Sequence, residues 1–230
     1  MAVERKRFVS FIHTSPAAIP PLMRYYSETA PELEITNQLD DGLLRMLSAQ
    51  NTVGTRQRLE QMLDVAVDTY RAELVMLTCS ALSSALVTEL AHSAGVPVFK
   101  IDDPMGADAV RRGRKLGVVI TFRPTGEPTC ALLRNAAVAA GKEVELITSV
   151  TPEAYDALLA GNADRHDDLL LDAIDGLSAQ GIDALVLAQV SMARLLPKLQ
   201  GRVNVPVYSS LTSSLAAIRK RLPVRISAVS

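Results

Sequence analysis

Apolar residues along the chain fall into short runs that alternate with segments of helical spacing. Two runs, Leu74–Leu77 and Ala184–Leu187, are apolar at every position, which is typical of strands covered by helices on both faces. The pattern predicts eight strands, at Phe8–Thr14, Leu33–Leu39, Leu74–Cys79, Val96–Ile101, Leu116–Phe122, Glu143–Ser149, Ala184–Val190 and Val205–Ser209.

Apolar residues at intervals of three and four mark helices between several of these strands. Leu59, Leu63, Ala66 and Tyr70 form such a stripe. The predicted helices are Arg56–Tyr70, Ser80–Ala94, Ala131–Ala140 and Leu169–Ala179. Because strands and helices alternate along the chain, the sequence predicts an α/β fold with parallel sheets.

The order of segments also suggests an internal duplication. Three pairs resemble one another at nearly the same offset: Phe8–Pro16 and Leu116–Pro124, Val75–Ser80 and Leu185–Val190, and Val96–Val98 and Val205–Val207. We interpret them as two similar halves. Strand–helix–strand units look alike in any α/β protein, so chance likeness is the alternative.

Composition and charge exclude several function classes. A formal net charge of −1 supplies no positive field for nucleic acid or anionic lipid. No apolar run approaches the roughly 20 residues of a membrane span. Two cysteines make no disulfide framework, so a reducing cytoplasm is the expected location. Neither a metal nor a nucleotide cofactor is expected, because His13, His92 and His166 lie far apart and there is no glycine-rich phosphate loop.

Ligands of open parallel sheets bind beyond the carboxyl ends of the strands, near the amino ends of helices. The residues that follow five of the predicted strands are nearly all small and polar, and such a set suits a small carboxylate. The alternative for each one is a helix cap. These residues are His13, Thr14, Ser15, Cys79, Ser80, Thr121, Gln189, Val190, Ser191, Ser209 and Ser210.

Cys79 has the most distinctive position among these residues. It lies where a strand is expected to meet a helix beginning at Ser80, and a helix amino end lowers the pKa of a thiol. The alternative is a small buried apolar residue. We interpret Cys130, inside a predicted helix, as a packing residue.

Four segments together resemble the aspartate/glutamate/hydantoin racemase superfamily, and the likeness covers the whole chain. They are Cys79 at the end of the third strand, Gly95–Val98 followed by Ile101–Pro104, Leu116–Thr121, and Leu185–Gln189 before Val205–Val207. The resemblance implies two α/β domains related by a pseudo-two-fold axis, with the site in the cleft between them. We assign residues 1–101 and 209–230 to the first domain and 102–208 to the second. The resemblance also implies no pyridoxal phosphate and a possible homo-oligomer.

In this superfamily two cysteines usually exchange protons with opposite faces of a substrate α-carbon. Cys79 matches the first, whereas Gln189 stands where the second is expected, and an amide transfers no proton at neutral pH. The alternatives are racemisation with His13 or Ser191 as substitute acid, a one-cysteine decarboxylation like that of arylmalonate decarboxylases, or nucleophilic addition as in maleate isomerases. A protein that binds a small acid without turnover is a further alternative.

The substrate-binding residues that this resemblance implies come from the same strand ends and from one loop. They are Thr14, Ser15, Asn51, Thr52, Ser80, Ala81, Thr121, Gln189, Val190 and Ser210. Arg56 or Arg123 could pair with a second carboxylate of the substrate, or could be an ordinary surface residue.

Overall fold

The computed structural model describes residues 6–222, and within them the chain forms two four-stranded parallel sheets. Residues 1–5 and 223–230, the two ends of the expected first domain, lie outside this range. In the first sheet the order is β2 (Leu33–Leu39), β1 (Arg7–His13), β3 (Leu74–Leu77), β4 (Val98–Lys100). In the second it is β6 (Glu145–Val150), β5 (Lys115–Ile120), β7 (Ala184–Leu187), β8 (Val207–Tyr208).

Helices and helical turns fill the connections. The α-helices are α1 (Ile19–Thr29), α2 (Gly42–Ser48), α3 (Thr52–Asp64), α4 (Ser84–Ser93), α5 (Asp103–Arg112), α6 (Gly126–Ala139), α7 (Pro152–Leu159), α8 (Ala163–Ser178), α9 (Leu196–Leu199) and α10 (Ser210–Arg221). Three 3-10 turns are η1 (Pro16–Ala18), η3 (Arg123–Thr125) and η4 (Val190–Leu195), and a π-helical turn, η2 (Val65–Thr69), extends α3. The predicted α/β class with parallel sheets is confirmed. No helix within the described range is both long and apolar enough to cross a bilayer.

All eight predicted strands are present, and the differences lie at their ends. The central strand β1 pairs with β2 over seven residues, from Arg7 to His13. The edge strand β8 keeps two residues instead of the predicted five.

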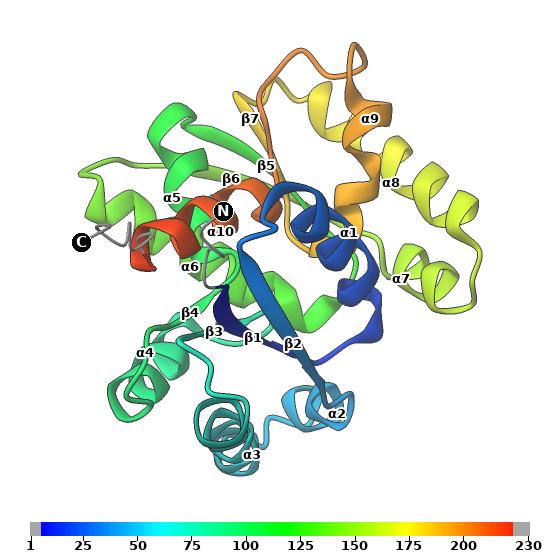
Figure 1. Cartoon of the computed structure of the whole chain (residues 1–230). Helices are drawn as coiled ribbons and strands as arrows, with labels where there is room; N and C mark the ends of the chain where they lie inside the picture. The colour runs from blue at the N-terminus through cyan, green and yellow to red at the C-terminus, as the bar shows by residue number, and fades with distance from the viewer. Residues whose placement is uncertain (1–5, 223–230) are drawn as a thin grey trace, which may run out of the picture.

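The two sheets have the same topology, as the duplicated segments predict. β1 and β5 occupy matching central places, β3 and β7 lie beside them, and β4 and β8 form matching edges. The second half lies above the first in Figure 1, with the helix α10 between them.

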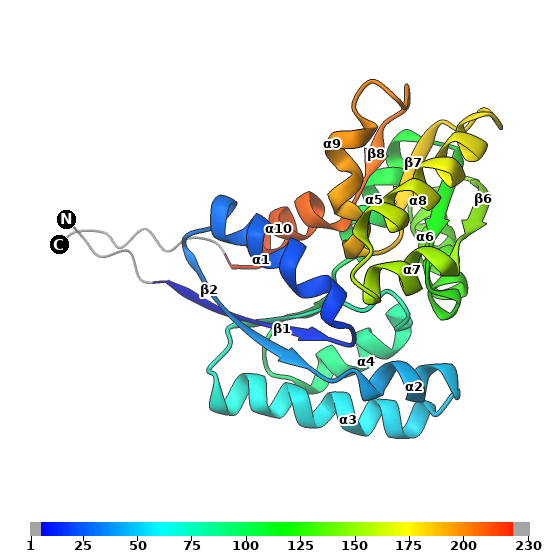
Figure 2. The ribbon, with the colours of Figure 1, turned by 90° about the vertical axis from the view of Figure 1, so that its right-hand side faces the viewer.

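Each sheet is covered by helices on both faces. On the first sheet, Phe11 packs with Tyr26 of α1 and Ile218 of α10, whereas Leu77 packs on the other face with Leu59 of α3. Figure 2 shows α3 on one side of this sheet, with α1 and α10 on the other. Burial of these side chains contributes about 1.5–3 kcal/mol each. Because α10 follows the second sheet in the sequence and packs on the first, the chain returns to the first sheet at its carboxyl end.

Candidate active site

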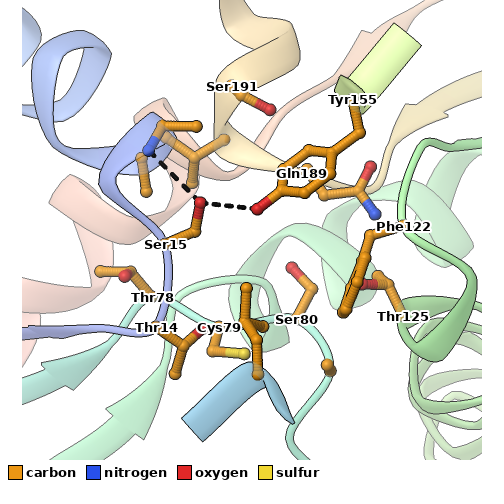
Figure 3. Close-up of a pocket in the computed structure, with 15 residues that line it drawn as sticks. Thr14, Ser15, Thr78, Cys79, Ser80, Phe122, Thr125, Tyr155, Gln189 and Ser191 are labelled. Atoms are coloured by element: carbon orange, nitrogen blue, oxygen red, sulfur yellow. Dashed lines mark hydrogen bonds between the residues drawn. The ribbon is translucent and has the colours of Figure 1, made fainter. Parts of the chain in front are cut away.

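A cavity opens between the two halves at the carboxyl ends of the central strands (Figure 3). The space between its atoms is about 440 Å³, which includes the open mouth toward solvent. Its wall combines hydroxyl, thiol and amide groups with apolar side chains. The residues are Thr14, Ser15, Ala17, Ala18, Leu44, Thr78, Cys79, Ser80, Ala81, Phe122, Thr125, Tyr155, Gln189, Val190 and Ser191.

Cys79 lies on this wall, in the loop that follows β3. The Thr14 side chain and the backbone amides of Ala81 and Leu82 lie near its sulfur and favour the thiolate, which lowers the pKa of the thiol. Burial nevertheless raises the pKa of the Cys79 thiol above its ordinary value, and the charge of Asp102 raises it further. The three donors favour the thiolate and reduce the rise. The thiol is therefore protonated at neutral pH, and the site contains groups arranged to receive its anion.

The expected lowering of this pKa by a helix beginning at Ser80 is wrong. The helix α4 begins at Ser84, where the Ser83 hydroxyl caps it by accepting a hydrogen bond of 3.2 Å from the Leu86 amide. Residues 78–83 form a loop, so the amides that reach the Cys79 sulfur belong to that loop. Burial is the larger influence on the thiol.

His13 does not reach the cavity. As the last residue of β1 it follows Val9 and Phe11 onto the face that α1 covers, and its side chain is fully buried. Its Nδ1 lies 2.8 Å from the Thr78 Oγ1 and its Nε2 lies 2.9 Å from the Asn37 Oδ1. Burial lowers the pKa of the imidazole. His13 thus supports Thr78 from behind the wall, and the structure does not place it against a substrate.

Gln189 does line the cavity, and its amide is held in one orientation. Its Oε1 accepts hydrogen bonds from the Thr121 backbone amide at 3.1 Å and from the Thr121 hydroxyl at 3.3 Å. Its Nε2 is buried and has no hydrogen-bond partner in the described residues. The Nε2 donor of this lining residue is thus left unsatisfied, and Thr121 itself does not line the cavity.

Tyr155 is a site residue that the strand-end reasoning missed. It comes from the first turn of α7, after β6, and its hydroxyl lies 2.8 Å from the Ser15 Oγ of the other half. Its ring packs against Phe122, with the ring centroids 5.5 Å apart. The sixth strand ends at Val150, and Pro152 shortly after it marks the start of a helix. That signal identifies the 151–155 segment.

Eight of the thirteen predicted site residues line the cavity. They are Thr14, Ser15, Cys79, Ser80, Ala81, Gln189, Val190 and Ser191. Asn51 instead caps α3, since its Oδ1 accepts a hydrogen bond of 3.0 Å from the Gly54 amide, and Thr52 is exposed beside it. Ser210 is the buried first residue of α10. Asn51 is therefore a helix cap, and neither Thr52 nor Ser210 lines the cavity.

The cavity wall is uncharged. None of its residues in the described part of the chain is an acid, a lysine or an arginine. Arg56 forms ion pairs with Glu60 and Glu89, and Arg123 is exposed outside the cavity. A second carboxylate on a ligand would therefore find no cation on this wall.

The described residues also contain no cluster of three or more His, Cys, Asp or Glu side chains that could hold a metal ion. Cys130 is buried in α6 and does not line the cavity. Cys79 is thus the cysteine at the site within the described residues.

Comparison with known proteins identifies the family. Residues 49–218 match the family model described as Asp/Glu/Hydantoin racemase, so the chain belongs to that family. No curated protein matches the chain by sequence.

Solved structures of several racemases share the fold. A glutamate racemase from Bacillus anthracis is 13% identical with a TM-score of 0.71, covering 95% of this chain and 83% of its own. An aspartate racemase from Picrophilus torridus is 14% identical with a TM-score of 0.68, covering 93% of each chain. An allantoin racemase from Klebsiella pneumoniae is 15% identical with a TM-score of 0.62, covering 94% and 88%. At these identities the likeness concerns the fold.

Proposed function

We propose that the protein is a racemase or isomerase that works without pyridoxal phosphate or metal at the α-carbon of a small acid derivative. Cys79 is the acid/base. The observation that carries this proposal is the position of its sulfur, on the wall of an interdomain cavity with three hydrogen-bond donors around it. Membership of the racemase family supports the same chemistry.

The chemistry needs a group that both takes and returns a proton. The Cys79 thiolate removes the α-proton and becomes a thiol, while the electron pair spreads into the adjoining carbonyl group. The Gln189 amide and the hydroxyls of Ser15 and Ser191 offer donors for the substrate oxygens. The hydrogen-bond donors around the Cys79 sulfur lower the free energy needed to form the thiolate.

The substrate class follows from the uncharged wall. Burying a charge without a partner is costly, so an ammonium group or a second carboxylate is disfavoured here. Leu44, Phe122 and Val190 provide apolar surface next to the donors. We propose an acid derivative with at most one negative charge and an apolar substituent, such as a substituted hydantoin, in preference to aspartate or glutamate.

A second candidate function is one-sided protonation after decarboxylation. It is favoured by Gln189, which occupies the expected second thiol position, and by the protonated state of Cys79. Loss of carbon dioxide from a malonate leaves a carbanion without any base, and a single thiol then supplies the proton. The Cys79 thiol would become a thiolate at that step and be reprotonated from solvent.

Enantiopure substituted hydantoins, aspartate, glutamate and prochiral arylmalonates, each incubated with the protein, separate these functions by chiral chromatography. The proposal predicts loss of optical purity in the hydantoins and none in the dicarboxylic amino acids. A single enantiomer of an arylalkanoic acid from the malonate would establish the decarboxylase. Binding of these compounds without turnover would contradict both and indicate a binding protein.

A further inference from the structure

Two titratable side chains meet at the cavity, one from each half of the molecule. Among the described lining residues, Cys79 and Tyr155 alone titrate in water below about pH 11. Cys79 follows β3 of the first sheet, whereas Tyr155 belongs to α7, which follows β6 of the second. This matches the requirement for two acid/base groups on opposite faces of one substrate.

The two groups face the cavity from different walls. In Figure 3 the Tyr155 ring extends into the cavity beside Gln189, while the Cys79 sulfur lies on the opposite side, near Ser80 and Thr14. Burial raises the pKa of the Tyr155 phenol, and the nearby charge of Cys79 adds to that rise. The phenol therefore rests protonated.

The orientation of the phenol is fixed by two contacts. Its hydroxyl lies 2.8 Å from the Ser15 Oγ, which in turn accepts a hydrogen bond of 3.3 Å from the Ala17 amide. Its ring packs against Phe122. Ser191 also lines the cavity, but an aliphatic alcohol is a far weaker acid than a phenol.

We propose that Tyr155 supplies the proton on the substrate face opposite Cys79. It thereby takes the role of the second thiol, whose expected position is occupied by Gln189. This inference rests on the proposed racemase function. It assigns a catalytic role to a residue outside the pattern of cysteine pairs.

The steps balance in protons and electrons. The Cys79 thiolate takes the α-proton, so that a C–H bond breaks, an S–H bond forms and the electron pair enters the carbonyl system. The Tyr155 O–H bond then breaks, and its proton bonds to the other face of the α-carbon. The phenolate that remains accepts a hydrogen bond from the Ser15 hydroxyl. Solvent reprotonates the phenolate and accepts the thiol proton, which restores both groups.

The test follows deuterium incorporation and configuration together in deuterated water, with an enantiopure substituted hydantoin as the probe. Tyr155→Phe keeps the ring on Phe122 and removes the acidic hydroxyl. We expect inversion to fall by about 100-fold or more, while Cys79 still exchanges the α-proton of one enantiomer with retention. Ser15→Ala and Ser191→Ala remove donors to the substrate oxygens, so each should lower exchange and inversion by similar factors. Tyr70→Phe, the same change at an exposed position, is the matched control.

Several results would overturn this role. Inversion that persists in Tyr155→Phe removes the phenol from the reaction. Equal losses of exchange and inversion in Tyr155→Phe and Ser15→Ala would show a structural latch between the halves. Loss of inversion in Ser191→Ala alone would assign the proton to Ser191. If the wild type exchanges no substrate at all, the proposed function itself fails, and the role of Tyr155 fails with it.

Discussion

The Ser80 hydroxyl donates a hydrogen bond of 2.8 Å to the backbone carbonyl of Ala188, across the boundary between the two halves. Ser80 follows Cys79, and Ala188 precedes Gln189. This bond therefore joins the two loops that present the thiol and the amide to the cavity, and both residues are buried.

Removing this bond should weaken the molecule. Ser80→Ala leaves the Ala188 carbonyl buried without its partner, so we expect the free energy of unfolding to fall by about 1–3 kcal/mol in urea titrations. Ser178→Ala is the control, because the Ser178 hydroxyl bonds to Ile174 within its own helix. Equal stability of the Ser80 variant and the wild type would show that this bond does not hold the halves.

The pH profile should report the raised pKa of the Cys79 thiol. Proton abstraction requires the thiolate, so α-proton exchange should increase from neutral pH into the alkaline range. Decarboxylation requires the thiol and should decline at high pH. Thr14→Val removes a donor that favours the thiolate, which raises the pKa and shifts the increase in exchange to higher pH. A shift to lower pH would contradict this environment of Cys79.

Gln189 should act in binding. Gln189→Ala removes the free Nε2 donor and leaves the Thr121 amide without its acceptor, so we expect KM to increase by about tenfold or more. Thr121→Val keeps the backbone hydrogen bond to Gln189 and should change KM by less than about threefold. A fall in kcat with unchanged KM would instead indicate that Gln189 acts in the chemical step.

Stability should decline in mild acid through two histidines. Burial lowers the pKa values of His13 and His166 below the ordinary 6.5, although their hydrogen bonds to Asn37 and Asp167 oppose this. The unfolded chain therefore binds protons that the folded chain does not. The stability that both histidines contribute is present above pH 6.5. It is lost as the pH falls through the lower pKa values that the two histidines have in the folded protein.

Urea titrations of His166→Gln at several pH values test this dependence. The variant should lose less stability between neutral and acidic pH than the wild type. His92→Gln, an exchange at an exposed position, should behave like the wild type. An acid dependence that the His166 variant leaves unchanged would count against this histidine as a source of it.

The sequence predicted the fold well because the signals for strands are local. Uninterrupted apolar runs such as Leu74–Leu77 need burial on both faces, and they form central strands. The start of α4 was misplaced because Ser80 and Ser83 are equally good caps on sequence. In the structure Ser80 lies in a loop, and its hydroxyl bonds to Ala188, more than one hundred residues away in the sequence. Local sequence patterns do not reveal such a contact.

Part of the candidate site was predicted because the ends of strands can be located from local sequence patterns. Strand ends identified Cys79, Ser15 and Gln189, since parallel strands bring their carboxyl ends to one edge. They did not exclude His13, which follows Val9 and Phe11 onto the face that α1 covers and so points away from the cavity. Tyr155 reaches the cavity from a helix of the other half, which is a tertiary relationship.

The central claim is that Cys79 exchanges a proton with the substrate α-carbon. Its most direct test is the rate of α-deuterium incorporation from deuterated water into a substituted hydantoin, measured side by side for wild type, Cys79→Ala and Cys130→Ala. We predict that the wild type and Cys130→Ala incorporate deuterium at similar rates and that Cys79→Ala is slower by about 100-fold or more. Undiminished incorporation by Cys79→Ala would contradict the assignment of Cys79 as the acid/base.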